Sequence, residues 1–251
     1  MASPAGLAVP GIRGSELTAQ MRARLPACAP AAPWSLSATA LVWLAPATRA
    51  AIGARQPGVR GRPLAVGGMF VSYSNTPVGP YQEVIGVLLL RDGLRVAVHI
   101  PFIAVDSPAS VVGGRANWSL PKTLAQFSGD LLHECGAGVG CAGEGGASHA
   151  AHQGGASHAA RQARAHHPDW QVRARARAMP GALPLALRFA LAQAAADGGL
   201  RRARGRARVR LSPAVVRVHT SGPPELTSWL RSGIYPGALV ARFDGQLDAS
   251  R

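Results

Sequence analysis

The residue of this chain with the most distinctive chemistry is its single lysine, Lys122. The sequence has 27 basic residues, Lys plus Arg, and 26 of them are arginines. The composition is rich in Ala, Gly, Pro and Arg, so arginine serves wherever a solvated positive charge is needed. Only an amine can lose its proton near neutral pH and attack a carbonyl carbon. Lys122 is therefore the candidate nucleophile for imine (Schiff-base) chemistry.

The residues around Lys122 favour an apolar setting for its amine. A Schiff-base lysine needs a depressed pKa, which comes from loss of water around the ammonium or from a second cation nearby. Trp118, Leu120 and Pro121 precede the lysine, and the proline restricts the path of the chain into it. The alternative is an ordinary surface lysine in a loop.

Two segments of the sequence resemble the acetoacetate decarboxylase family. Residues 114–123 read GRANWSLPKT, which is similar to the family's GRE-x-W-G-x-P-K-K stretch with its imine-forming lysine. Residues 79–83 read GPYQE, which is similar to the family's G-P-Y-x-E with its active-site glutamate. By this resemblance, which covers about residues 34–250, Lys122 is the nucleophile and Glu83 the catalytic carboxylate. It also implies a homo-oligomer, a small keto-acid substrate and no metal or organic cofactor.

The lysine segment departs from the family pattern at three positions. Thr123 stands where the family has a second lysine, so a cation at that position cannot lower the pKa of the amine. Desolvation would have to act alone or together with Arg115 folded nearby. Ala116 and Ser119 replace the usual Glu and Gly, and residues 50–82 contain no Asp or Glu that could supply a second family carboxylate. These departures weaken the substrate assignment more than the imine assignment.

The sequence and the resemblance together predict a carboxy-lyase that forms a Schiff base with a small β-keto acid. In this hypothesis Lys122 attacks the ketone, and Glu83 orients the substrate or shuttles a proton. Arg115 is expected to pair with the substrate carboxylate. The other side chains expected to bind substrate are Tyr81, Trp118 and Leu120.

Three other functions stay open at this level. A lysine aldolase or dehydratase of the same fold, acting on a 2-oxo acid, would share the imine but release no CO₂ from acetoacetate. A non-catalytic protein that binds a small carbonyl compound would keep an amine with an ordinary pKa of about 10.4. A nucleic-acid binder would use the arginines, but the arginine stretch 201–210 has no aromatic residues for base stacking. Nucleic acid is therefore the least favoured partner.

The elements that must position Lys122 and Glu83 are mainly strands. No 3.6-residue period runs through residues 64–105, which disfavours a helical bundle. Instead, apolar runs lie at 67–73, 83–90 and 94–103 and are separated by turn residues. This pattern indicates an antiparallel meander. Residues 36–44 fit either a strand or a short buried helix.

Later segments of the chain also show strand periodicity. Residues 171–178 and 202–211 alternate arginine with apolar or small residues, which predicts strands with one basic face and one apolar face. Residues 185–191 alternate as well, but a helix starting at Pro184 fits equally. We expect two further elements, a short helix at 228–230 and a closing strand at 237–247. With the resemblance, these patterns predict a mainly β, α+β domain whose curved, barrel-like antiparallel sheet encloses an apolar pocket.

The predicted domain covers residues 34–251, after an irregular arm at 1–33 and with a low-complexity insertion at 136–167. Within the insertion, the nine residues at 145–153 recur in closely similar form at 154–162. Its histidines and two nearby cysteines could hold zinc or nickel, but their spacing does not match a structural zinc site. We therefore predict no metal site.

The composition excludes several classes of protein. A chain that is 47% hydrophobic and 16% charged is not disordered throughout. No apolar run approaches the length of a membrane span, and the first thirty residues do not read as a secretory signal. Three cysteines without CxxC spacing indicate neither a disulfide framework nor a zinc ribbon. The cytoplasm is the predicted compartment.

Overall fold

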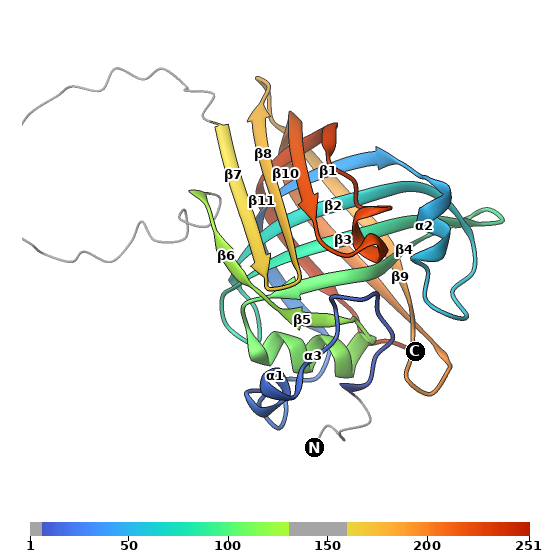
Figure 1. Ribbon diagram of the computed structural model, residues 1–251. Coiled ribbons are helices and arrows are strands. Elements are labelled where there is room, and N and C mark those ends of the chain that lie inside the picture. Colours follow the sequence, from blue (N-terminus) through green and yellow to red (C-terminus); the bar gives the residue numbers. More distant parts are fainter. Residues whose placement is uncertain (1–6, 131–159) are drawn as a thin grey trace, which may run out of the picture.

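Four long strands follow one another as an antiparallel meander in the computed structural model, which describes residues 7–130 and 160–251 (Figure 1). They are β1 (Trp34–Pro46), β2 (Arg62–Asn75), β3 (Tyr81–Asp92) and β4 (Arg95–Val105). Each pairs antiparallel with the next, so the predicted meander is confirmed. The segment that fitted either strand or helix belongs to β1, because that strand has hydrogen-bonded neighbours on both sides.

Three later strands close the meander into a ring (Figure 1). They are β9 (Leu183–Ala194), β10 (Leu200–Ser221) and β11 (Gly233–Leu247). Strand β11 pairs with β1 on one side and β10 on the other, and β10 pairs with β9. The ring closes where Val98 of β4 pairs with Leu191 of β9. The predicted barrel-like sheet is therefore confirmed: its ring pairings are antiparallel except for this parallel closure, and the ambiguous segment at 185–191 is a strand.

The second half of β10 carries an extension of the same sheet. Its strands are β8 (Trp170–Ala178), β7 (Ala160–His167) and β6 (Gln126–Ser128). The predicted insertion at 136–167 is wrong at its end, because residues 160–167 alternate buried and exposed side chains as an ordinary strand against β8. The first copy of the repeat, and most of the second, lie outside the described residues.

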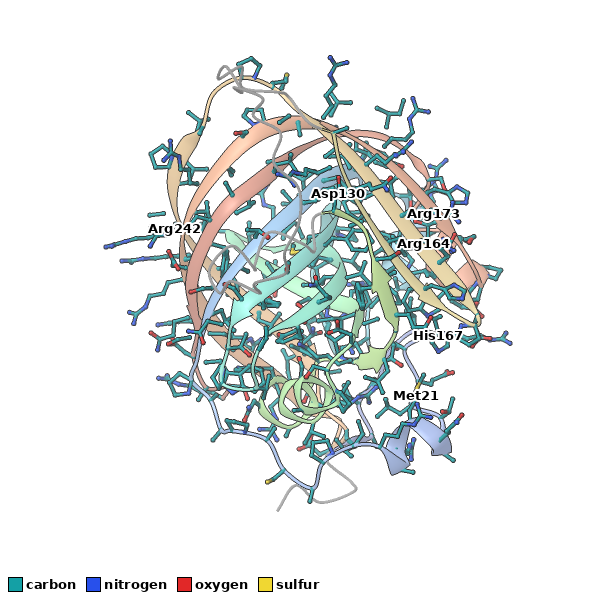
Figure 2. All side chains as sticks on the ribbon, turned by 90° about the vertical axis from the view of Figure 1, so that its left-hand side faces the viewer. Met21, Asp130, Arg164, His167, Arg173 and Arg242 are labelled. Atoms are coloured by element: carbon teal, nitrogen blue, oxygen red, sulfur yellow. The ribbon has the colours of Figure 1, made fainter. Side chains whose placement is uncertain are left out.

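The arginine faces predicted for the later strands are exposed. In β8 the apolar positions are buried and the arginines face outward. Arg164 of β7 lies opposite Arg173 of β8, and Figure 2 shows both on the outer side of these strands. These arginines are solvated charges on the convex side of the sheet, so the apolar face is left to pack inward.

Each ring strand contributes to two separate apolar clusters, one on each face. Ala40, Val71 and Ile85 face the inside of the ring. Their chain neighbours, such as Phe70 and Val84, face the other way and pack with the extension. Because successive side chains of a strand point to opposite faces, strands covered on both sides read as continuous apolar runs. This explains the apolar run at residues 84–90 of β3.

The described part of the chain has four short helices at the edges of the sheet. They are α1 (Ala19–Ala23), α2 (Arg49–Gly53), α3 (Pro108–Trp118) and α4 (Pro224–Thr227). The short helix predicted at 228–230 is instead α4, which begins at a proline pair and ends at Thr227, before that segment. Helix α1 interrupts the arm that was predicted to be irregular. Within the described residues, no helix is long and apolar enough to span a membrane.

Candidate active site

Helix α3 and the short strand that follows it place Lys122 against the ring. Ser107 caps α3 by accepting a hydrogen bond from the Ser110 N–H, and Pro108 occupies the first turn. The helix ends at Trp118, and Ser119 caps it with a left-handed φ of 53°. The chain then enters β5 (Lys122–Leu124), where Lys122 pairs in parallel with Ile103 of β4.

The amine of Lys122 is buried among hydrogen-bond acceptors. Its side chain is 4% exposed and donates to Glu83 Oε2 at 2.5 Å and Ser110 Oγ at 2.9 Å. The hydroxyl oxygen of Tyr81 lies 3.4 Å from Nζ. An ammonium has three N–H donors, and these three oxygens provide one acceptor for each. The predicted nucleophile and the predicted carboxylate are therefore in direct contact.

Tyr73 holds the carboxylate from the adjacent strand β2, and Tyr81 lies on the same strand as Glu83. Tyr73 of β2 lies directly opposite Tyr81 of β3, with ring centroids 4.6 Å apart. The Tyr73 hydroxyl donates to Glu83 Oε1 at 3.2 Å. Burial raises the pKa of both phenols well above 10, and the negative charge of Glu83 raises them further. Both hydroxyls therefore keep their protons at neutral pH, and Tyr73 can donate to the carboxylate.

Arg115 lies behind the lysine and not in the cavity. Its buried guanidinium donates to three backbone oxygens, those of Lys122 at 2.8 Å, Leu7 at 2.6 Å and Ser15 at 2.9 Å. Burial lowers the pKa of Arg115 to about 10, with a smaller effect from the like charge of Arg22, so the side chain stays charged at pH 7. All three of its nitrogens are occupied by carbonyls, which does not support the predicted pairing with a substrate carboxylate.

Thr123 also faces the N-terminal arm. Its hydroxyl donates to the backbone oxygen of Glu16 at 3.1 Å and lies 3.7 Å from the sulfur of Met21. Figure 2 shows Met21 at the arm, below the sheet. Because neighbouring residues of a strand point to opposite sides, position 123 cannot face the cavity while Lys122 does. The threonine therefore packs the arm against β5.

The inside of the ring holds a cavity of about 420 Å³. Lys122, Glu83, Tyr73 and Tyr81 supply polar groups to its wall, and Arg188 and Gln246 also line it. The predicted residues Tyr81, Trp118 and Leu120 line it too, although their contact with a substrate stays a prediction. The remaining lining is mainly apolar and includes Trp34, Val71, Ile85, Ile103, Val209 and Val240.

Ser110 and Tyr73 are two functional candidates that the sequence reasoning missed. Ser110 reaches the lysine only because α3 packs beside β5. The Ser107–Pro108 start is a sequence signal that could have indicated this helix. Tyr73 reaches the carboxylate only through the register of β2 with β3. Neither contact has a motif of its own.

The described residues contain no group of three or more His, Cys, Asp or Glu side chains placed to hold a metal ion. The histidines and cysteines considered as ligands lie mostly within 131–159, outside those residues. The site around Lys122 thus consists of an amine, a carboxylate and hydroxyls. These groups suit imine formation and proton transfer.

Comparison with known proteins agrees with this fold. The chain resembles the enduracididine biosynthesis enzyme MppR complexed with pyruvate (TM-score 0.62, 11% identity, covering 88% of this chain and 90% of that chain). It also resembles acetoacetate decarboxylase from Legionella pneumophila (TM-score 0.55, 13% identity, 91% and 90% covered). A third similar structure is an acetoacetate decarboxylase-like enzyme from Sphingomonas wittichii (TM-score 0.59, 13% identity, 88% and 92% covered). Comparison with curated protein sequences gave no match.

The comparison of the sequence with family profiles identifies the family of this chain more directly than the fold similarity does. The profile named acetoacetate decarboxylase (ADC) matches residues 59–224. That range contains β2, β3, α3 and β5, and so both Glu83 and Lys122. Because the match spans more than half of the sequence, the chain belongs to the acetoacetate decarboxylase family.

Proposed function

We propose that this chain is a decarboxylase of a β-keto acid that uses Lys122 as its imine-forming nucleophile. Membership of the family supports a lysine-dependent enzyme, and the particular reaction is the proposal. The observation that carries it is the buried contact of 2.5 Å between Lys122 Nζ and Glu83 Oε2 at the wall of an apolar cavity.

The contact provides a route to the neutral amine. Transfer of one proton from Lys122 to Glu83 leaves a free electron pair on Nζ, which attacks the ketone carbon and forms a carbinolamine. Glu83 returns the proton to the departing hydroxyl, so water leaves and a protonated imine remains. Ser110 and Tyr73 keep the amine and the carboxylate in place during these transfers.

The protonated imine then accepts the electron pair of the breaking carbon–carbon bond. CO₂ leaves, the C–N double bond becomes a single bond, and a neutral enamine forms. Protonation of the enamine carbon and attack by water on the imine release the ketone and restore the amine. An apolar wall favours this step, because the negative charge of the carboxylate is lost as CO₂ departs and solvation of that charge stabilises only the ground state.

The second candidate is an aldol or dehydration reaction on a 2-oxo acid at the same lysine. One observation favours it: a similar structure is described as a complex with pyruvate, which is a 2-oxo acid. The groups around Lys122 would serve either reaction, since both begin with the same imine. A homo-oligomeric assembly and a cytoplasmic location stay predictions.

Borohydride trapping tests the imine. The protein is incubated with acetoacetate, reduced, and its intact mass compared with that of a Lys122→Arg control. With no other lysine in the sequence, the N-terminal amine is the one competing site. An adduct that disappears in the control, together with CO₂ release, supports the decarboxylase; an adduct without CO₂ favours the second candidate. Absence of any adduct with acetoacetate and a panel of 2-oxo acids refutes imine catalysis on these substrates.

A further inference from the structure

We infer that the natural substrate of the Lys122 site carries an apolar chain several carbons longer than the methyl group of acetoacetate, as a medium-chain β-keto acid does. This inference rests on the proposed function, because it assumes that the ketone carbon is held at the amine. The three observations behind it are the size of the cavity, the row of side chains leading away from Glu83, and the position of the charges.

The cavity is too large for a four-carbon substrate alone. Its volume is about 420 Å³, and a water-sized group takes up about 30 Å³. The space therefore accommodates roughly fourteen such groups, about twice the non-hydrogen atoms of acetoacetate. Sites for drug-sized molecules start at about 300 Å³. A substrate that fills the ring must extend well beyond the reacting carbons.

A continuous row of cavity-lining side chains crosses the sheet from the carboxylate. Glu83 pairs with Val71, Val71 with Ala40, Ala40 with Val240, and Val240 with Leu211. All five line the cavity. Four steps at about 4.8 Å between strands extend roughly 19 Å along the curved wall. We call Val71, Ala40, Val240 and Leu211 the apolar belt.

The belt leads from the interior toward the surface. Glu83 is 2% exposed, Ala40 and Val240 are buried, and Leu211 is half-buried. None of the four belt side chains can donate or accept a hydrogen bond. A substrate chain lying along them would be held by burial of its own apolar surface, and a polar chain would lose its water without replacement.

The positions of the charges around the cavity also favour a substrate with a long apolar chain. Among the described residues that line the cavity, the cations are Lys122 and Arg188, and Arg188 is exposed. Arg115 is occupied by backbone oxygens. Lys122 itself becomes the imine, which leaves the exposed Arg188 as the only cation among the described lining residues. We therefore expect binding to depend mainly on the non-reacting part of the substrate, because each buried methylene strengthens binding about fourfold.

A series of methyl ketones measures this dependence directly. Propanone, pentan-2-one, heptan-2-one and nonan-2-one are each trapped on Lys122 with borohydride, and the concentration for half-maximal labelling is recorded. We expect it to fall about fifteenfold for each added pair of methylenes until the chain fills the cavity. A concentration that stays constant or rises along the series overturns the inference.

A substitution in the belt localises the effect. Ala40→Leu extends into the middle of the belt, so it should remove most of the advantage that heptan-2-one and nonan-2-one have over propanone. The matched control is Ala241→Leu, an exposed alanine next to Val240 on β11, which should leave the series unchanged. Equal effects of both variants contradict the role of the belt. If Ala40→Leu does not fold, the wild-type series decides alone.

A non-reactive variant separates this inference from the proposed function. Lys122→Met cannot form an imine, but Trp34 and Trp118 line its cavity and report ketone binding by fluorescence quenching. If no ketone labels the wild-type protein, yet both proteins bind longer ketones more tightly, imine catalysis fails and the apolar substrate class stands. If acetoacetate and propanone label Lys122 as readily as nonan-2-one does, the substrate class fails and imine catalysis stands.

Discussion

Replacing Gly114 by alanine should displace the amine of Lys122 without unfolding the protein. Gly114 lies in α3, and a Cβ added there would come within 2.6 Å of Lys122 Cδ and 2.7 Å of Cε. Carbon atoms pack best at about 3.5–4.0 Å, so the lysine stem must move by about 1 Å. A shift of that size at a reacting group costs about a hundredfold in rate, or about 2.7 kcal/mol in activation free energy.

The free energy of unfolding should change much less. Alanine is favoured over glycine in a helix interior by about 1 kcal/mol, and this gain offsets part of the loss of about 1.5–3 kcal/mol in hydrogen bonds to the charged amine. We therefore expect net destabilisation of about 0.5–2 kcal/mol. A large loss of stability would mean that the clash is not absorbed by the lysine.

The assay compares the initial rate of imine trapping with acetoacetate in Gly114→Ala, the wild-type protein and a matched control. The control is Gly53→Ala, since Gly53 ends helix α2 and an added Cβ there meets no atom within 4 Å. Urea unfolding of the same three proteins measures stability. A Gly114→Ala protein that reacts at the wild-type rate would refute the reasoning, as would an equal loss in Gly53→Ala.

Three further predictions concern the surroundings of the lysine and the core. Glu83→Gln should lower the rate of CO₂ release by about 10²–10⁴-fold, because it removes the group that exchanges a proton with Lys122; a rate within tenfold of wild type would exclude that role. Arg115→Ala should destabilise the protein by about 3 kcal/mol or more in urea unfolding, because three backbone oxygens lose a buried donor. The N-terminal arm should also become open to limited proteolysis, and an arm that stays protected would show that Arg115 does not hold it in place. His99 is fully buried and its pKa is lowered to about 4 by burial, so the unfolded chain binds a proton there first as the pH falls. Its contribution of about 3 kcal/mol is therefore present above pH 6.5 and lost between pH 6.5 and 4, and His99→Asn should show a correspondingly shallower loss of unfolding free energy over that range.

The amino-acid sequence by itself singled out Lys122 and Glu83, which the fold brings into contact, and most of the strands. Lys122 stands out because it is the one amine among many guanidinium groups, and Glu83 stands out through the GPYQE stretch. The strands follow from period-two and continuous apolar patterns, which depend on local side-chain geometry alone. The family match over residues 59–224 agrees with both.

The tertiary structure decided what each remaining side chain contacts. Arg115 lies near Lys122 in the chain, yet its guanidinium turns to the backbone of the N-terminal arm, a hundred residues away in sequence. Ser110, Tyr73 and the apolar belt come together through helix packing and strand register. Contacts of this kind join distant parts of the chain, and they depend on which groups remain unpaired once the strands have assembled. No local pattern encodes them, so the partners of the amine and the shape of the cavity could be known only from the folded chain.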